Sequence, residues 1–144
     1  LGMGKFMNCV KKLLSYSVVI LSAVILQIRA PAIADDFSIS FEWGDIPRCT
    51  SGNPFTVDNP IFTLSNVPEG TVEIRFKLRD MDAPSYNHGG GTAEYIGEDV
   101  IQPGAFRYKS PCPPSGRHRY RWKATAKNAD GDVLAEAKSI KQYP

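Results

Sequence analysis

The sequence predicts an all-β domain folded as an antiparallel β-sandwich, and three observations support this prediction. Apolar and polar side chains alternate with a period of two along several segments, and turns that carry Gly or Pro separate these segments. No stretch after the first 34 residues has a convincing helical period. Several short strands joined by regular turns in a domain of this length are typical of two packed sheets.

The first strands are expected in the amino-terminal half of this domain. Residues 37–43 alternate Phe, Ile, Phe and Trp with Ser and Glu, so one face of this strand meets the core. A short strand is expected at residues 61–64. Residues 72–78 repeat the alternation, with apolar side chains at even positions facing the core and charged side chains at odd positions facing water.

The remaining strands are expected in the carboxy-terminal half. A short strand is expected near residues 95–101, and residues 117–126 form another long alternation with His, Tyr, Trp and Ala at even positions. Asp130-Gly131 supplies the permissive backbone of a hairpin turn. Residues 133–140 can therefore return as the last strand.

Residues 1–34 are interpreted as a signal peptide that is cleaved. Three lysines precede an apolar run over residues 13–28, and Ala32-Ile33-Ala34 offers small residues at a cleavage site. A retained membrane anchor is the alternative, since the run approaches the width of a bilayer. Cleavage leaves residues 35–144 as one periplasmic or secreted domain, with no stable membrane span.

The charge of this domain differs from that of the whole chain. The 144 residues carry a formal net charge of +2, but four of the 17 Lys and Arg residues lie in the leader and all 15 acids follow it. The domain therefore has 13 cations against 15 acids, a net charge of −2. Such a balance does not indicate nucleic acid or an anionic membrane as a partner.

Basic and aromatic residues alternate along residues 117–123 but do not share a face. The basic residues occupy odd positions, whereas His118, Tyr120 and Trp122 occupy even positions. They cannot act together as a platform on which bases stack, so no nucleic-acid partner is expected. A solvated strand face is the interpretation we favour, and it could still steer an acidic partner toward the domain.

Two cysteines remain after cleavage, and they are predicted to form a disulfide. Cys49 and Cys112 would both lie in an oxidising compartment. They are 63 positions apart, and closing a loop of that length stabilises a small domain by about 4 kcal/mol through loop entropy. Two unrelated free thiols are the alternative.

A first group of polar residues follows the strand at residues 72–78. Asp80 and Asp82 continue its even-numbered series, so both carboxylates are predicted on the core face, where an ionised group needs a partner. His88 is the nearest candidate, and a carboxylate would raise the pKa of its imidazole and leave one ring nitrogen free for an anion. Residues 89–91, all Gly, could add an anion-binding concavity of backbone amides, with a flexible turn as the alternative.

A second group precedes and begins the strand at residues 117–126. Prolines flank Cys112, and Ser115-Gly116 turns the chain. His118 and Tyr120 then emerge on the inward face, where a hydroxyl and an imidazole could meet His88 over one pocket. A structural role for His118 and ordinary core packing for Trp122 are the alternatives.

Together these two groups resemble the phosphatidylethanolamine-binding protein family, in particular a short exported form of its bacterial YbhB/YbcL-like (Raf kinase inhibitor-like) branch. Residues 80–84 match the family's Asp-Pro-Asp-Ala-Pro except at Met81, a later histidine matches His88, and residues 110–120 match its turn before His-Arg-Tyr. The resemblance implies a β-sandwich, without the carboxy-terminal helix of longer relatives, whose pocket binds small anions or phospholipid head groups. The residues that it places at the pocket are Asp80, Asp82, Pro84, His88, Ser110, Pro111, His118 and Tyr120.

No catalysis, cofactor or metal site is expected. Residues 88–91 look like an esterase oxyanion-hole motif, but the chain has no Gly-x-Ser-x-Gly elbow to accompany it. Two histidines and two oxidised cysteines are a poor set of metal ligands. The alternative function is a protein-interaction module, such as a protease inhibitor or an immunoglobulin-like surface domain. A pocket blocked by Met81, or His88 turned to solvent, would favour that alternative.

Overall fold

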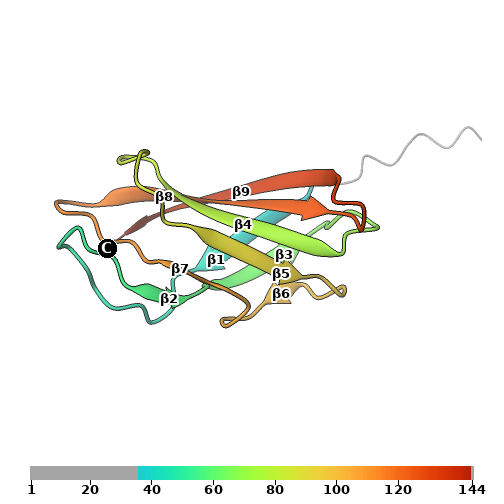
Figure 1. Cartoon of the computed structure of the whole chain (residues 1–144), viewed down its shortest axis with the longest axis horizontal. Coiled ribbons are helices and arrows are strands. Elements are labelled where there is room, and N and C mark those ends of the chain that lie inside the picture. The colour runs from blue at the N-terminus through green and yellow to red at the C-terminus, as the bar shows by residue number, and fades with distance from the viewer. Residues whose placement is uncertain (1–35, 144) are drawn as a thin grey trace, which may run out of the picture. The chain divides into compact units, whose positions relative to one another are not determined.

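The structure, a computed structural model, describes residues 36–143, and these form nine strands with no helix (Figure 1). The predicted signal peptide lies outside the described residues. Among the described residues there is no helix of the length and apolarity that a membrane span requires. The strands are β1 (Ser38–Glu42), β2 (Thr56–Asp58), β3 (Ile61–Ser65), β4 (Glu73–Asp80), β5 (Gly90–Glu94), β6 (Val100–Ile101), β7 (Arg107–Lys109), β8 (His118–Lys127) and β9 (Val133–Tyr143).

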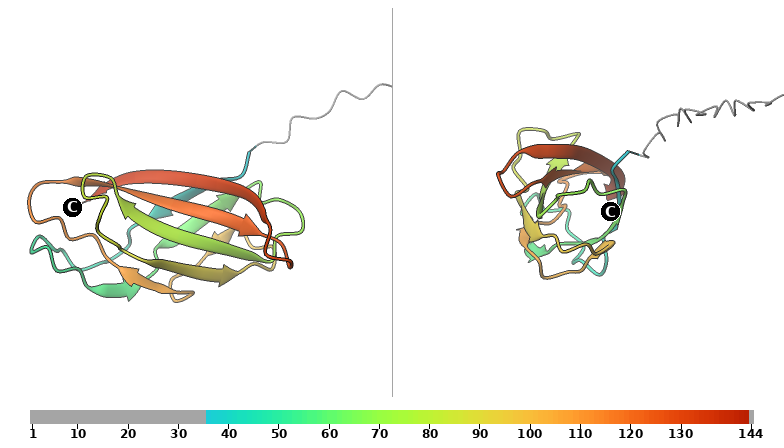
Figure 2. Two further views of the ribbon diagram at one scale, coloured as in Figure 1. Left: turned by 45° about the horizontal axis from the view of Figure 1, so that its top comes forward. Right: turned by 90° about the vertical axis from the view of Figure 1, so that its right-hand side faces the viewer.

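All strand pairs are antiparallel, which confirms the predicted class. The larger sheet has the order β5-β4-β8-β9, and the smaller sheets have the orders β1-β3-β6 and β2-β7. Figure 1 shows β4, β8 and β9 in one layer, with β2 and β6 on the opposite side of the domain. The right-hand view of Figure 2 shows the same two layers from the end. The buried hydrophobic side chains lie between them.

Aromatic side chains join the two layers. Phe62 on β3 stacks on Phe76 of β4 with ring centroids 4.3 Å apart, and meets Trp122 of β8 edge-to-face at 5.1 Å. All three side chains are fully buried. Rings in such offset and perpendicular contacts add to the free energy gained from burying apolar surface. Trp122 is therefore a core residue, as the packing alternative predicted.

The long alternations are confirmed with small changes at their ends. Strand β4 continues to Asp80 and β9 to Tyr143, whereas Val72, predicted to face the core, precedes β4 and is 42% exposed. Of the strand expected near residues 95–101, only Val100–Ile101 pairs, as β6. Strands β2 and β7 were not predicted, because three residues are too few to show a period.

Strand β5 corrects the interpretation of the glycine run. Gly90 and Gly91 pair with β4 instead of forming a flexible turn or a concavity of free amides. A Cβ on Gly90 would lie 2.0 Å from the carbonyl oxygen of Phe76, and a Cβ on Gly91 would lie 2.3 Å from the Cβ of Phe106. Gly90 also has φ near +145°, which L side chains rarely adopt. These glycines permit close packing of a strand.

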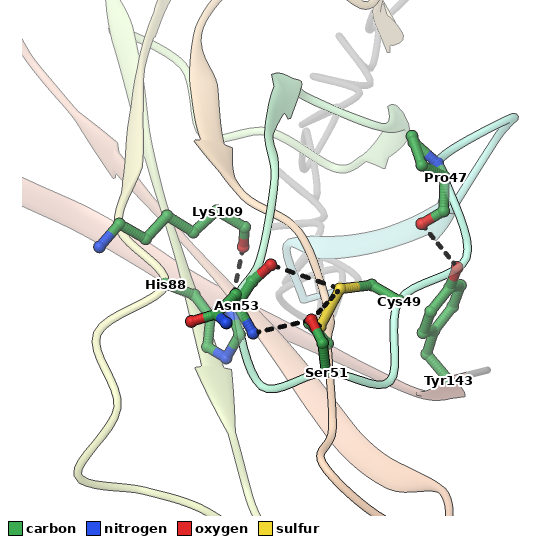
Figure 3. Close-up of a disulfide and its surroundings, with 8 residues drawn as sticks. Pro47, Cys49, Ser51, Asn53, His88, Lys109 and Tyr143 are labelled. Carbon is green, nitrogen blue, oxygen red and sulfur yellow. Dashed lines mark hydrogen bonds between the residues drawn. A yellow bond between two sulfur atoms is a disulfide. The ribbon is translucent and has the colours of Figure 1, made fainter.

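The predicted disulfide is present. Cys49 and Cys112 are bonded, with Cα atoms 4.5 Å apart, and the hydroxyl of Ser51 lies 3.6 Å from each sulfur (Figure 3). The bond joins the segment before β2 to the segment between β7 and β8. Two long connections that carry no strand of their own are thus held together covalently.

Gly91→Ala is expected to destabilise the domain by about 2 kcal/mol or more, because the new Cβ collides with Phe106 and either β5 or the loop before β7 must move. Urea unfolding followed by tryptophan fluorescence measures this loss. Thr92→Ala on the same strand is the matched control, since Thr92 is exposed and its loss of stability should stay below about 1 kcal/mol. Equal losses in the two variants would contradict the packing role of Gly91.

Candidate functional site

A hollow of about 280 Å³ lies beside the end of β4, between the loop after that strand and the disulfide-linked segments. Its size is near the lower limit for small-molecule pockets. The side chains with hydrogen-bonding or acidic groups on its wall are Asp80, Ser85, Tyr86, His88 and Tyr120, and its rigid wall comprises Cys112, Pro113 and Pro114. This hollow is the candidate site, and we refer to it as the pocket.

Asp80 is the last residue of β4 and is only 3% exposed. One carboxylate oxygen accepts hydrogen bonds from the amides of Asp82 (2.9 Å) and Ala83 (3.0 Å). The other lies 2.7 Å from Nδ1 of His118. Burial opposes ionisation, but these hydrogen bonds outweigh it and lower the pKa of Asp80. Asp80 is therefore a fully partnered buried carboxylate.

The partner of Asp80 differs from the predicted one. The sequence suggested His88, but β4 and β8 pair in a register that sets Asp80 opposite Tyr120 and brings His118 to the carboxylate. His118 thus has the structural role that was left open, since it anchors Asp80 and does not line the pocket. Sequence distance favoured His88, whereas strand pairing brought the more distant histidine closer.

His88 does lie in the pocket, and it is 3% exposed. Its Nδ1 is 2.9 Å from the carbonyl oxygen of Lys109 (Figure 3). Since a carbonyl only accepts, Nδ1 carries a proton, and Nε2 is the nitrogen left for another partner. Burial lowers the pKa of His88 below its ordinary 6.5, although the Lys109 carbonyl and the charge of Asp80 act in the opposite direction. The predicted rise in this pKa is therefore wrong.

Tyr120 supplies a hydroxyl at the pocket. Its side chain is fully buried, and the hydroxyl has no hydrogen-bond partner among residues 36–143. Its ring packs perpendicular to His88, with centroids 5.5 Å apart. Burial, with the charge of Asp80, raises the pKa of Tyr120, so the hydroxyl stays protonated and able to donate. A buried hydroxyl of this kind lacks a hydrogen bond that most such groups make.

Besides His118, four residues that the resemblance assigned to the pocket do not line it. Asp82, predicted on the core face, follows the end of β4, is exposed and binds Arg119, with 2.8 Å between Oδ1 and a guanidinium nitrogen. This pairing lowers the pKa of Asp82 to about 2. Pro84 is exposed and lines a neighbouring depression. Ser110 and Pro111 are fully buried and are not among the residues that line the pocket.

Sequence reasoning missed Tyr86 and the direct contribution of Cys112 to the pocket. The Tyr86 ring meets that of His88 with centroids 4.7 Å apart, and Lys109 Nζ lies 5.6 Å from its centre. Tyr86 follows Pro84 by two positions, in the loop between β4 and β5. The alternation of apolar and polar residues that predicts strands does not predict the conformation of such a loop. Its one signal was an aromatic residue two positions before the candidate histidine.

The described residues contain no group of three or more His, Cys, Asp or Glu side chains that could bind a metal ion. The pocket instead contains groups that can donate hydrogen bonds. Tyr120 has a hydroxyl without a partner, and His88 has a ring nitrogen without one assigned. The pocket therefore has groups that can form hydrogen bonds with a small polar molecule.

Comparisons with known proteins leave the family open. No protein-family model and no curated protein matches the chain. Among solved structures, the chain is similar to a Chlamydia trachomatis D/UW-3/CX protein described as a proposed homologue of phosphatidylethanolamine-binding protein. The identity is 17% and the TM-score 0.46, over 76% of this chain and 97% of that one. A likeness at this level does not establish membership, so the family resemblance stays a prediction.

Asp80→Asn is expected to lower the free energy of unfolding by about 2 kcal/mol at neutral pH, because a buried charge-assisted hydrogen bond to His118 is lost. The lowered pKa of Asp80 means that this stabilisation is present above pH 3.8 and is lost as the pH falls through the folded-state value. Urea unfolding of both proteins across the acid range should show their difference shrink below pH 3.8.

The control for this variant is Asp82→Asn. Asp82 is exposed and binds Arg119 at the surface, so its loss should cost less than that of Asp80. A greater loss at Asp82, or a difference for Asp80 that persists unchanged into acid, would contradict the role assigned to the buried carboxylate.

Proposed function

We propose that this chain is an exported binding protein without catalytic activity, and that its pocket binds a small anion of the phosphate type, either free or as the head group of a phospholipid. The observation that carries the proposal is the unpartnered hydroxyl of Tyr120 beside His88 in a pocket of about 280 Å³. An anionic oxygen would supply the acceptor that this buried donor lacks.

The charges around the pocket are compatible with an anion even though Asp80 lies on its wall. Both carboxylate oxygens already accept hydrogen bonds, and His118 lies against one of them. Lys109 extends over the ring of Tyr86, a lining residue, and brings an ammonium group near the pocket. An incoming anion also favours the protonated form of His88, which would then donate from Nε2.

Two observations favour the pocket over the alternative of a protein-interaction module. His88 is buried within the pocket and not turned to solvent. Met81 is not among the residues that line the pocket. The disulfide supports export, because such bonds persist in oxidising compartments.

The proposal is tested by titrating the protein with phosphate and with phosphoethanolamine while NMR follows the ring signals of His88 and His118. We expect both histidines to shift at one saturable site, because His118 is linked to the pocket through Asp80. His88→Ala should abolish binding. Tyr120→Phe keeps the ring and removes only the hydroxyl, so it should weaken binding by about tenfold, the effect of one hydrogen bond.

Arg48→Ala serves as a matched control, because Arg48 is exposed and lies outside the pocket. It should leave the affinity unchanged. Histidine signals that stay silent with both ligands, or a Tyr120→Phe variant that binds as tightly as the wild type, would overturn the anion pocket and leave the interaction module as the better account.

Anion binding should raise the pKa of His88. Burial keeps this pKa below 6.5 in the free protein, and a bound anion stabilises the imidazolium, so binding is accompanied by proton uptake and strengthens as the pH falls below 6.5. Sulfate is the probe, because its charge is constant over this range. NMR titration of the His88 ring with and without sulfate measures the change. A pKa that sulfate leaves unaltered, at saturating concentration, would contradict direct contact.

A further inference from the structure

The outer face of the larger sheet carries a cluster of cations that is independent of the pocket. Five Lys and Arg side chains on β4, β8 and β9 point away from the core and have no ion-pair partner within residues 36–143. We call this cluster the basic face, and its residues are Arg75, Lys77, Arg79, Arg121 and Lys138.

The strand register places like charges directly opposite one another. Lys77 is opposite Lys123, and Lys123 is opposite Lys138, so three lysines form one row across three strands. Arg79 is opposite Arg121 in the next row. Like charges in such positions destabilise a sheet, so this arrangement does not serve the fold itself. An anionic partner would remove the repulsion.

Depressions in this face offer a path for such a partner. One of about 300 Å³ is lined by four residues of the basic face together with Lys123 and Glu136. A second, of about 370 Å³, lies beside β5 and includes Arg75. Lys77 lines both, so the two depressions adjoin along β4. Together the two depressions extend over residues of β5, β4, β8 and β9.

Arg121 provides an independent sign of a binding site. Its Nε is buried and has no hydrogen-bond partner among the described residues, although a guanidinium normally pairs with a carboxylate or phosphate. Arg121 also lines the depression of about 300 Å³. A sulfate or phosphate oxygen in this depression would be the missing acceptor.

Other features of the face distinguish among polyanions. The aromatic side chains of β8 point into the core, so bases have no surface on which to stack, and the described residues include no helix that could enter a groove of duplex DNA. Sheets twist by roughly 20° from strand to strand, so the cations of three strands do not lie in the plane of a bilayer. A flexible linear chain can follow them.

The acids that β4 and β9 place on this face are paired with lysines, whereas Glu94 on β5 lies opposite Glu73 and has no ion pair among the described residues. Glu136 lies 2.7 Å from Lys123 and Glu73 lies 3.8 Å from Lys127, so each is compensated locally. The cations of the basic face on β4 are two residues apart, which spaces them by about 7 Å along the strand. A chain with repeated charges can contact several of them in turn.

We propose that the basic face binds a linear polysaccharide that carries sulfate or phosphate groups, lying along β4 and β8 over Lys77 and Arg121. The contacts are made by flexible, partly exposed cations, so the affinity falls steeply as salt screens them. The residues that line the pocket take no part. A variant that no longer binds the polysaccharide at the basic face should therefore still bind phosphate in the pocket at His88.

The test measures binding of a heparin-derived oligosaccharide by calorimetry at low and physiological salt. Lys77→Glu/Lys138→Glu reverses two exposed charges of the basic face and should weaken binding by about tenfold or more. Arg48→Glu/Arg107→Glu makes the same change in net charge at exposed positions away from this face and should bind like the wild type. Urea unfolding confirms that both variants are folded.

Equal affinity of the two double variants, or no binding by the wild type at low salt, would overturn the proposal. A random-sequence DNA duplex and phosphatidylserine vesicles are the comparison ligands. If either binds more tightly than the oligosaccharide and depends on Lys77 and Lys138, the polysaccharide assignment is wrong. Tighter binding of the oligosaccharide, sensitive to the first double variant alone, supports it.

Discussion

The pocket depends on one buried carboxylate. Asp80 ends β4, and its two oxygens bind the loop that follows and the first residue of β8 at the same time. A buried charge without these partners would be costly, so the loop after β4 must fold back and His118 must stay in place. That backbone course brings Tyr86 and His88 over Tyr120. The geometry of the site thus follows from the hydrogen bonds that the buried carboxylate of Asp80 requires.

The sequence was sufficient for the parts of the fold that have a period. The alternations that became β1, β4 and β8 each bury one face, and hydrophobic side chains on alternate positions can do so only as strands. Strand β5 could not be predicted in this way, because Gly90 and Gly91 have no side chains from which to read a period. Their fit against Phe106 is a property of the packed core and not of the local sequence.

The candidate site was partly predictable for a related reason. The even-numbered positions of Asp80 and Tyr120 correctly predicted that both face inward, since alternate side chains of a strand point to opposite faces. The same reasoning failed at Asp82, because β4 ends at Asp80 and side chains in a loop do not alternate between two faces. Which histidine reaches the carboxylate depends on the register between β4 and β8. That register spans about forty positions and no local pattern specifies it.

The disulfide has a consequence for how one wall of the pocket is held in place. Cys112 is at once a wall residue of the pocket and one end of the covalent link to Cys49. Oxidation of the two thiols therefore ties this wall covalently to the segment before β2. A chain with reduced thiols would keep the strand pairs but lack this covalent constraint on the wall. The redox state of the surroundings would thus decide how firmly this side of the cavity is held.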